Sequence, residues 1–212
     1  RFAAEGYSIV MLARNADYLN SLSAQLPDSL AIPCDVRDPE AIGAVFEQIH
    51  DEVGAPDVLV YNAGSGEWSN VEETTVDGME SSWRTNTLGL LVASQQVIPA
   101  MKSRASGSIV VIGATASLRG GANSTAFASA KSAQRSLAQS MARRLGPTGI
   151  HVSCVIIDGI IDLERTRAAR PDVPDEHYLQ PDDIARSVYD LTRQHRSAWT
   201  FELDLRPFGE KW

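Results

Sequence analysis

Short runs of apolar residues alternate along this chain with longer stretches in which apolar residues recur at helical spacing. The short runs carry no polar face, which is typical of strands that are buried on both sides. Such strands, separated by helices, predict one α/β domain with a doubly wound parallel sheet (Rossmann-type) that helices cover on both faces. The predicted strands are 8–13, 30–32, 58–61, 108–112, 151–157 and 201–205, and the predicted helices are 17–25, 38–53, 82–104, 125–145 and 181–194.

Local signals refine this outline at four places. Asp38 followed by Pro39 is a typical helix N-cap and first helical position. Residues 1–6 read as the last turn of a helix that ends at a glycine. Residues 165–180, rich in Pro, Asp and Arg, predict a mobile loop or lid. The aromatic tail at 208–212 is expected to dock against protein.

Composition and charge exclude several classes of protein. The 212 residues are 43% hydrophobic and 22% charged, as expected for one folded domain. A net charge of -8 without a Lys/Arg stripe argues against binding nucleic acid or an anionic membrane. No apolar run approaches the roughly 20 residues that span a bilayer, and no targeting peptide is recognisable. The four histidines are scattered, so no metal site is predicted. We therefore expect a cytoplasmic protein that binds neither nucleic acid nor membranes.

Ligands of an open parallel sheet bind outside the carboxyl ends of its strands. The residues that follow the predicted strands are therefore the first candidates for a site. They are Arg14-Asn15, Cys34-Asp35-Val36, Asn62-Ala63-Gly64, Gly113 to Ser117 and Asp158 to Ile161.

These segments resemble the short-chain dehydrogenase/reductase family. The resemblance rests on Asp35-Val36, on Asn62-Ala63-Gly64, on Asn86 and on Lys131, in this order and at the family's spacing. It covers residues 1–160 and, more loosely, the rest of the chain. It implies that 1–212 form a single dinucleotide-binding domain that lacks its first βα unit. That unit would carry the Gly-rich turn that holds the cofactor pyrophosphate. About 20–30 residues are then expected ahead of Arg1, and a truncated gene product is the alternative.

The same resemblance implies a nicotinamide cofactor and distributes its contacts along the chain. Each position also has an ordinary explanation, such as a turn-capping role for an Asp. The implied contacts are Asp35 and Val36 to the adenine, Asn62, Ala63 and Gly64 near the adenosine ribose, Lys131 on the nicotinamide ribose, and Gly159 and Ile160 near the nicotinamide amide.

Arg14 bears on the choice of cofactor. Family members that prefer NAD place an acidic residue at the end of this strand, where the chain has Ala13 followed by Arg14. A guanidinium group can bind a 2′-phosphate, and no carboxylate repels it. We therefore expect NADP rather than NAD, the alternative for Arg14 being a solvated surface residue.

Two of the four catalytic positions that the resemblance implies are changed. Active family members use Ser, Tyr and Lys, with Asn as a fourth member. Lys131 and Asn86 are present, and Asn86 is implied to hold a water next to the lysine. Phe127 stands at the Tyr position, four residues before Lys131, and Ala114 stands at the Ser position. Removing a general acid typically costs about 10²–10⁴-fold in rate.

Other residues lie close enough in sequence to supply the missing hydroxyl or proton. Thr115 and Ser117 flank Ala114, Tyr178 lies in the predicted lid, and Asp158 takes the place of a usual Pro. Turn formation or packing is the ordinary role for each of them.

The sequence thus predicts an NADP-dependent oxidoreductase with an atypical active site. It would move a hydride to or from a small carbonyl, alcohol or activated alkene. The alternative is a catalytically impaired NADP(H)-binding protein that acts as a redox sensor or partner subunit. The resemblance and the small residues Ala126, Ser129, Ala130 and Ala133 suggest a homodimer or homotetramer, although those residues could also pack only within one subunit.

Overall fold

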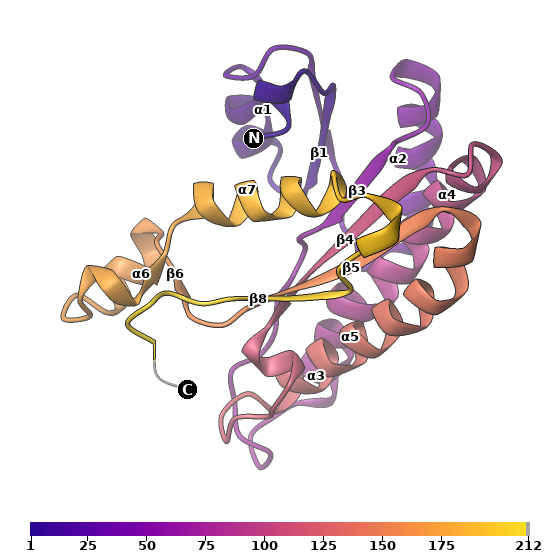
Figure 1. Ribbon diagram of the computed structural model, residues 1–212. Helices are drawn as coiled ribbons and strands as arrows, with labels where there is room; N and C mark the ends of the chain where they lie inside the picture. Colours follow the sequence, from indigo (N-terminus) through magenta and orange to yellow (C-terminus); the bar gives the residue numbers. More distant parts are fainter. Residues whose placement is uncertain (211–212) are drawn as a thin grey trace.

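A four-stranded parallel sheet lies at the centre of the molecule (Figure 1). The computed structural model describes residues 1–210. The central sheet has the order β3-β4-β5-β8, and its longest pairing joins β4 to β5, from Gly107 opposite Ile150 to Ala114 opposite Ile157. The strands are β1 (Ile9–Ala13), β2 (Ser29–Pro33), β3 (Val58–Tyr61), β4 (Gly107–Ala114), β5 (Ile150–Ile157), β6 (Ile160–Ile161), β7 (Tyr178–Leu179) and β8 (Glu202–Leu205). The helices are α1 (Ala16–Ser23), α2 (Pro39–Glu52), α3 (Val76–Trp83), α4 (Gly89–Ser103), α5 (Thr125–Leu145), α6 (Glu164–Ala169) and α7 (Pro181–Thr192).

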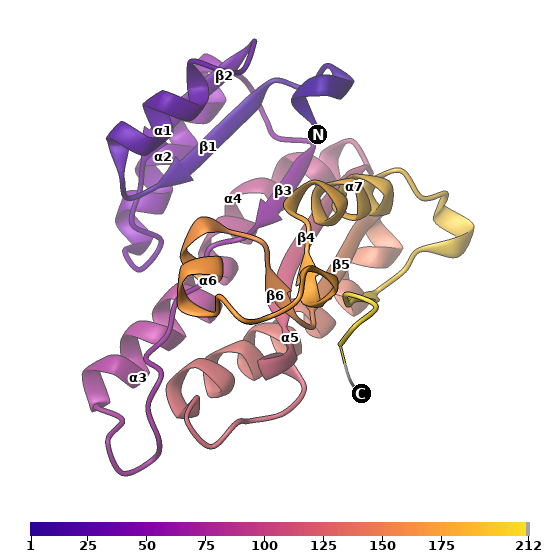
Figure 2. The same cartoon turned by 90° about the vertical axis from the view of Figure 1, so that its left-hand side faces the viewer.

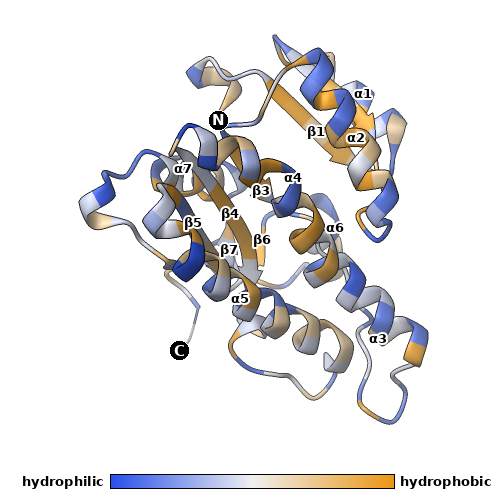
Figure 3. Ribbon diagram, turned by 90° about the vertical axis from the view of Figure 1, so that its right-hand side faces the viewer, coloured by the Kyte–Doolittle hydropathy of each residue, from blue (hydrophilic) through white to orange (hydrophobic). Residues whose placement is uncertain are grey.

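Helices cover both faces of the central sheet, as the apolar runs predict. α4 and α5 pack on one face and α7 on the other. Successive side chains of β4 therefore enter two different hydrophobic cores. Ile109 packs in the core that includes Leu90 of α4, and Val110 packs in the core that includes Val188 of α7. The strands accordingly lie among the most hydrophobic segments (Figure 3). The doubly wound α/β class is confirmed.

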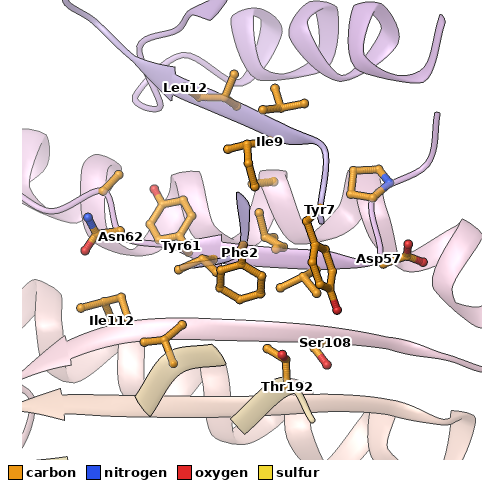
Figure 4. A pocket seen from close by; sticks show the side chains of 18 of the residues that line it. Phe2, Tyr7, Ile9, Leu12, Asp57, Tyr61, Asn62, Ser108, Ile112 and Thr192 are labelled. Carbon is orange, nitrogen blue, oxygen red and sulfur yellow. The ribbon is translucent and has the colours of Figure 1, made fainter. Parts of the chain in front are cut away.

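β1 and β2 form a separate two-stranded parallel sheet. A cavity of about 1700 Å³ is lined by residues of β1 on one side and of β3 on the other. Figure 2 shows β1 and β2 apart from the central sheet, and Figure 4 shows Ile9 and Leu12 of β1 opposite Tyr61 of β3. Val60 of β3 is 36% exposed, whereas Val110, its partner on β4, is 1% exposed. The apolar edge of β3 is thus open to the cavity.

The observed boundaries depart from the sequence prediction in two regions. The helix predicted to begin at Ser82 begins at Val76, where the Thr75 hydroxyl accepts a hydrogen bond from Gly78 N at 2.9 Å. It then passes through a π-helical turn, Arg84–Leu88, into α4. The expected lid contains α6 and β7, and β7 pairs in parallel with β6.

Other local predictions agree with the structure. Asp38 caps α2 by accepting from Glu40 N at 2.9 Å. Residues Ala3–Glu5 form a helical turn, and Gly6 ends it with a φ of 80°. The aromatic tail, in contrast, does not dock within the subunit at Phe208, which is 90% exposed; Trp212 lies outside the described residues. No helix within residues 1–210 is long and apolar enough to cross a membrane.

Candidate active site

The loops that follow the parallel strands bring the predicted residues to one edge of the sheet. Asn62 to Gly64 follow β3, Thr115 follows β4, and Asp158 follows β5. Lys131 reaches this edge from α5, because its ammonium nitrogen donates to the carbonyl of Ile112 on β4 at 2.9 Å.

Lys131 is a buried lysine held by neutral groups. Its side chain is 5% exposed, and Nζ also donates to Gln134 Oε1 at 3.0 Å. Among the described residues it takes part in no ion pair. Burial therefore lowers the pKa of the Lys131 ammonium to about 8. A group with this pKa can donate or accept a proton near neutral pH.

Asn86 presents a buried oxygen beside the same lysine. It is fully buried in the π-helical turn, and its Nδ2 donates to the carbonyls of Ser65 at 2.6 Å and Ser82 at 2.8 Å. Its Oδ1 has no hydrogen-bond partner within residues 1–210. Leaving a buried acceptor unpaired costs roughly 1–3 kcal/mol, so this oxygen is suited to a group that arrives with the ligand.

Gly64 lies beside both groups. A Cβ atom built on Gly64 would be 3.2 Å from Lys131 Nζ and 3.4 Å from Asn86 Oδ1. A donor and an acceptor therefore lie close to each other at this glycine, and a side chain at position 64 would crowd both. A hydroxyl group both donates and accepts, so these residues fit a sugar hydroxyl such as those of a nicotinamide ribose.

The Tyr and Ser positions of the resemblance hold no hydroxyl. The Phe127 ring lies 5.9 Å from Lys131 Nζ and 4.8 Å from the ring of Trp68. A Cβ atom on Gly66 would lie 2.6 Å from Phe127 Cβ, so the loop 64–68 packs directly over this residue. Ala114 contributes only its backbone N–H, which donates to Ser117 Oγ at 3.1 Å.

The nearby polar residues are engaged elsewhere. Thr115 Oγ1 donates to Asp158 Oδ1 at 2.5 Å, and Arg206 Nε donates to Asp158 Oδ2 at 2.9 Å. These two partners lower the pKa of the Asp158 carboxyl, which makes it a poor proton donor near neutral pH. The Tyr178 hydroxyl donates to the carbonyl of Arg170 at 3.0 Å. Partners within the chain thus engage the side chains of Ser117, Thr115, Asp158 and Tyr178.

The residues predicted near the adenosine also gather at the cavity, whose lining includes Arg14, Asp35, Val36 and Asn62 to Gly64. Arg37 donates to Asp35 Oδ2 from Nη2 at 2.6 Å and from Nε at 3.0 Å. This hydrogen bonding is the main reason that the pKa of Asp35 is lowered, and the charge of Arg14 adds to it. Arg14 is exposed and has no ion-pair partner in the described part of the chain.

The bend after β5 is retained despite the change from Pro to Asp158. Gly159 has a φ of 158°, and a Cβ atom there would lie 2.7 Å from Pro207 Cδ. Ile160 then begins β6 and pairs with Tyr178. A glycine is required at this close approach between two loops.

Two residues of the site are absent from the sequence prediction. Gln134 contacts both Lys131 and Asn86. The sequence feature that could have indicated it is a glutamine three residues after Lys131, on the same face of a predicted helix. Arg37 binds the carboxylate of Asp35. The sequence indicates this contact only by placing the two residues two positions apart.

Comparison with known proteins identifies the family of the chain. The sequence pattern of the family described as short chain dehydrogenase matches residues 1–173. A short-chain dehydrogenase from Rhodopseudomonas palustris is 32% identical, with a TM-score of 0.83 over 98% of this chain and 90% of that one. An uncharacterised oxidoreductase of Staphylococcus aureus (strain N315) is 28% identical over 205 residues, which are 96% of this chain and 87% of that protein. An alcohol dehydrogenase from the archaeon Thermococcus sibiricus, complexed with 5-hydroxy-NADP, is 23% identical. It has the same fold, with a TM-score of 0.87 over 99% of this chain and 90% of that one.

Proposed function

This chain belongs to the short-chain dehydrogenase family and is an oxidoreductase, and from that premise we propose that it moves a hydride between NADP and a small carbonyl, alcohol or activated alkene. The observation that carries the proposal is the pair of groups at Gly64. Lys131 Nζ and the unpaired Asn86 Oδ1 lie side by side next to Gly64, as a donor and an acceptor suited to one ribose hydroxyl of the cofactor.

Arg14 supports NADP as the cofactor. Its guanidinium is exposed at the end of β1, beside the cavity that Asp35 and Val36 also line. Because Asp35 is held by Arg37, the two arginines leave this end of the cavity able to accept an anionic group. The NADP analogue bound by the Thermococcus alcohol dehydrogenase is consistent with this choice.

The proposed chemistry needs a proton that neither Phe127 nor Ala114 can supply. When bound, the nicotinamide supplies the hydride for reduction or accepts it for oxidation. In reduction of a carbonyl, the hydride joins the carbonyl carbon, the π electrons move to oxygen, and that oxygen takes a proton from water. Because Lys131 and Asn86 hold the ribose hydroxyl, this water comes from solvent, and the hydroxide that it leaves regains a proton there. We expect the reaction to be slow, because no phenol is positioned to act as the general acid.

We also propose that the cavity between β1 and β3 receives an apolar strand that pairs with both. Ile9, Leu12 and Val60 present apolar side chains to it, and an open apolar strand edge is unfavourable in water. A strand there would join the two sheets into one. Its carboxyl end would lie beside Arg14 and Asn62, where a Gly-rich turn could bind the cofactor pyrophosphate.

We further propose that the protein is a homodimer or homotetramer. Ala126 and Ala130 are buried within the subunit, which accounts for two of the small residues on α5. Trp83 on α3 and Leu91 on α4 are 45% and 38% exposed and are suited to contact a second copy.

A carbonyl panel tests the proposed reaction. NADPH oxidation by the intact protein would be followed at the absorbance of the reduced nicotinamide, with NADH in parallel. Slow, saturable and NADPH-selective turnover on one substrate class is expected. Binding of NADPH without any turnover would instead favour a cofactor-binding sensor or partner subunit.

A further inference from the structure

Gln134 is a fully buried polar residue on the helix that carries Lys131. It follows Lys131 by three residues on α5, so the two side chains share one face of the helix. Ala130 and Ala138, also buried, are its neighbours on this face. A buried amide destabilises the fold unless its donor and acceptor groups find partners. The identity of those partners therefore shows what the glutamine does.

Both ends of the Gln134 amide are bonded to residues of the candidate site. Oε1 accepts from Lys131 Nζ at 3.0 Å, and Nε2 donates to the backbone oxygen of Asn86 at 2.8 Å. Asn86 lies in the π-helical turn, a local change of helix geometry that is frequent at functional sites. One side chain thus connects α5 to the turn at Arg84–Leu88. It directly joins the residue that offers the donor to the residue that offers the acceptor.

The direction of Lys131 follows from these contacts. An ammonium group has three donors, and the carbonyl of Ile112 and Gln134 Oε1 occupy two of them. No third hydrogen-bond partner of Nζ lies among the described residues, so the third donor is left for a ligand. Nζ and Asn86 Oδ1 lie 3.2 Å and 3.4 Å from the Cβ position of Gly64, so the two groups are close neighbours.

We propose that Gln134 is a positioning residue that fixes Lys131 Nζ and Asn86 Oδ1 next to Gly64, so that together they bind one hydroxyl group. The part of this inference that concerns the hydroxyl rests on the proposed cofactor; the part that concerns Lys131 does not. The family resemblance implies a water between Asn86 and the lysine. In this chain Gln134 contacts both residues directly.

The competing role is that Gln134 merely fills the core. The two roles predict different effects on the pKa of Lys131. Replacing a residue that only fills the core leaves this pKa unchanged, whereas replacing a residue that holds Nζ changes it. The charged or titratable neighbour that acts on Lys131 within the described residues is Cys154 of β5. Burial raises the pKa of the Cys154 thiol to about 11, so this thiol stays neutral while Lys131 titrates.

The test is a pH titration of the intact protein labelled with ¹³C-lysine and observed by NMR. The sequence has three lysines, Lys102, Lys131 and Lys211, so the signals are readily assigned by substitution, and the exposed Lys102 is an internal reference. Gln134→Glu places a carboxylate on Nζ and should raise the pKa of Lys131 by at least about one unit. Gln134→Leu removes the acceptor, should lower that pKa further, and should weaken NADPH binding about tenfold or more. Ala138→Gly on the same helix is the control: it should lower the melting temperature and leave both readouts unchanged.

Unchanged Lys131 titrations in both Gln134 variants would overturn the proposal. NADPH affinity within twofold of the native value in Gln134→Leu would overturn its hydroxyl-binding part. If Gln134→Leu does not fold, Gln134→Glu, which keeps the shape of the side chain, decides alone. If the native protein binds no NADPH, the proposed function fails, but the NMR titration still decides whether Gln134 fixes Lys131.

Discussion

The indole of Trp68 lies against the ring of Phe127, with the ring centroids 4.8 Å apart and the planes inclined by 35°. Trp68 is 70% exposed, so this aromatic pair lies at the surface, with Phe127 partly buried beneath the indole. The family position that delivers a proton is thus occupied by an apolar pair, 5.9 Å from a lysine that remains in place.

Restoring the two hydroxyls should increase carbonyl reduction. In Phe127→Tyr combined with Ala114→Ser, a phenol would stand one helical turn from Lys131, whose charge lowers the phenol pKa. We expect kcat with NADPH to rise by about 10²-fold or more, measured on the best substrate of a carbonyl panel. Phe127→Leu with Ala114→Ser is the matched control and should bring no gain. A native protein that turns over well and is harmed by the tyrosine would show that its chemistry uses Phe127 differently.

Removing Lys131 should change how stability depends on pH. The pKa of Lys131 is about 8 in the folded protein and 10.5 ordinarily, so the unfolded chain binds more protons between these values. The unfolding free energy therefore increases as pH rises from 8 to 10.5, and the destabilisation by the buried ammonium is largest below pH 8. The unfolding free energy of Lys131→Met relative to native should fall by up to about 3 kcal/mol across that window. Urea unfolding at several pH values measures it. Parallel pH dependences of the unfolding free energy for the two proteins would show that burial does not lower the pKa of Lys131.

Replacing Arg14 should separate the two cofactors. Arg14→Leu removes the guanidinium expected to bind the 2′-phosphate, so the Kd for NADPH should rise about tenfold or more. The Kd for NADH, which lacks that phosphate, should change less than about twofold by the same argument. Arg186→Leu on α7, exposed and outside the cavity lining, is the control. Equal weakening of both cofactors would refute the role given to Arg14.

A charge in the cavity between β1 and β3 should reveal whether a strand fills it. Val60 is 36% exposed as described, so a lysine there would be tolerated within about 0.5 kcal/mol if the cavity held only water. If an apolar strand covers it, Val60→Lys should cost several kcal/mol. Chemical unfolding measures the difference, with Val71→Lys at a 76% exposed position as the control. Equal costs at the two positions would contradict the proposed strand.

The parts of the fold that were predictable follow from patterns within single segments. β5 is buried along its whole length, and its sequence is a largely apolar run. Asp38-Pro39 indicates the start of α2, because Asp is a favoured N-cap and Pro a favoured first helical residue. The start of α3 was missed because Val76 and Met79 are exposed, so no buried stripe marks that helix. The π-helical turn at Arg84–Leu88 has no periodicity of its own to detect.

The site divides in the same way. Asn86 and Lys131 were predictable as positions, but the unpaired state of Asn86 Oδ1 depends on carbonyls of Ser65 and Ser82 that only folding brings to its amide. Gln134 was missed because its contact with Asn86 joins residues 48 positions apart, and only the fold brings them together. The engagement of Asp158 by Arg206, likewise 48 positions away, could not be read from the turn that contains it.

Direct cofactor binding tests the central claim. The intact protein would be titrated with NADPH and with NADH, following the fluorescence of the reduced nicotinamide. We predict saturable binding of both, with the lower Kd for NADPH. Tighter binding of NADH would contradict the assignment of NADP, and binding of neither would contradict the cofactor site built around Lys131, Asn86 and Gly64.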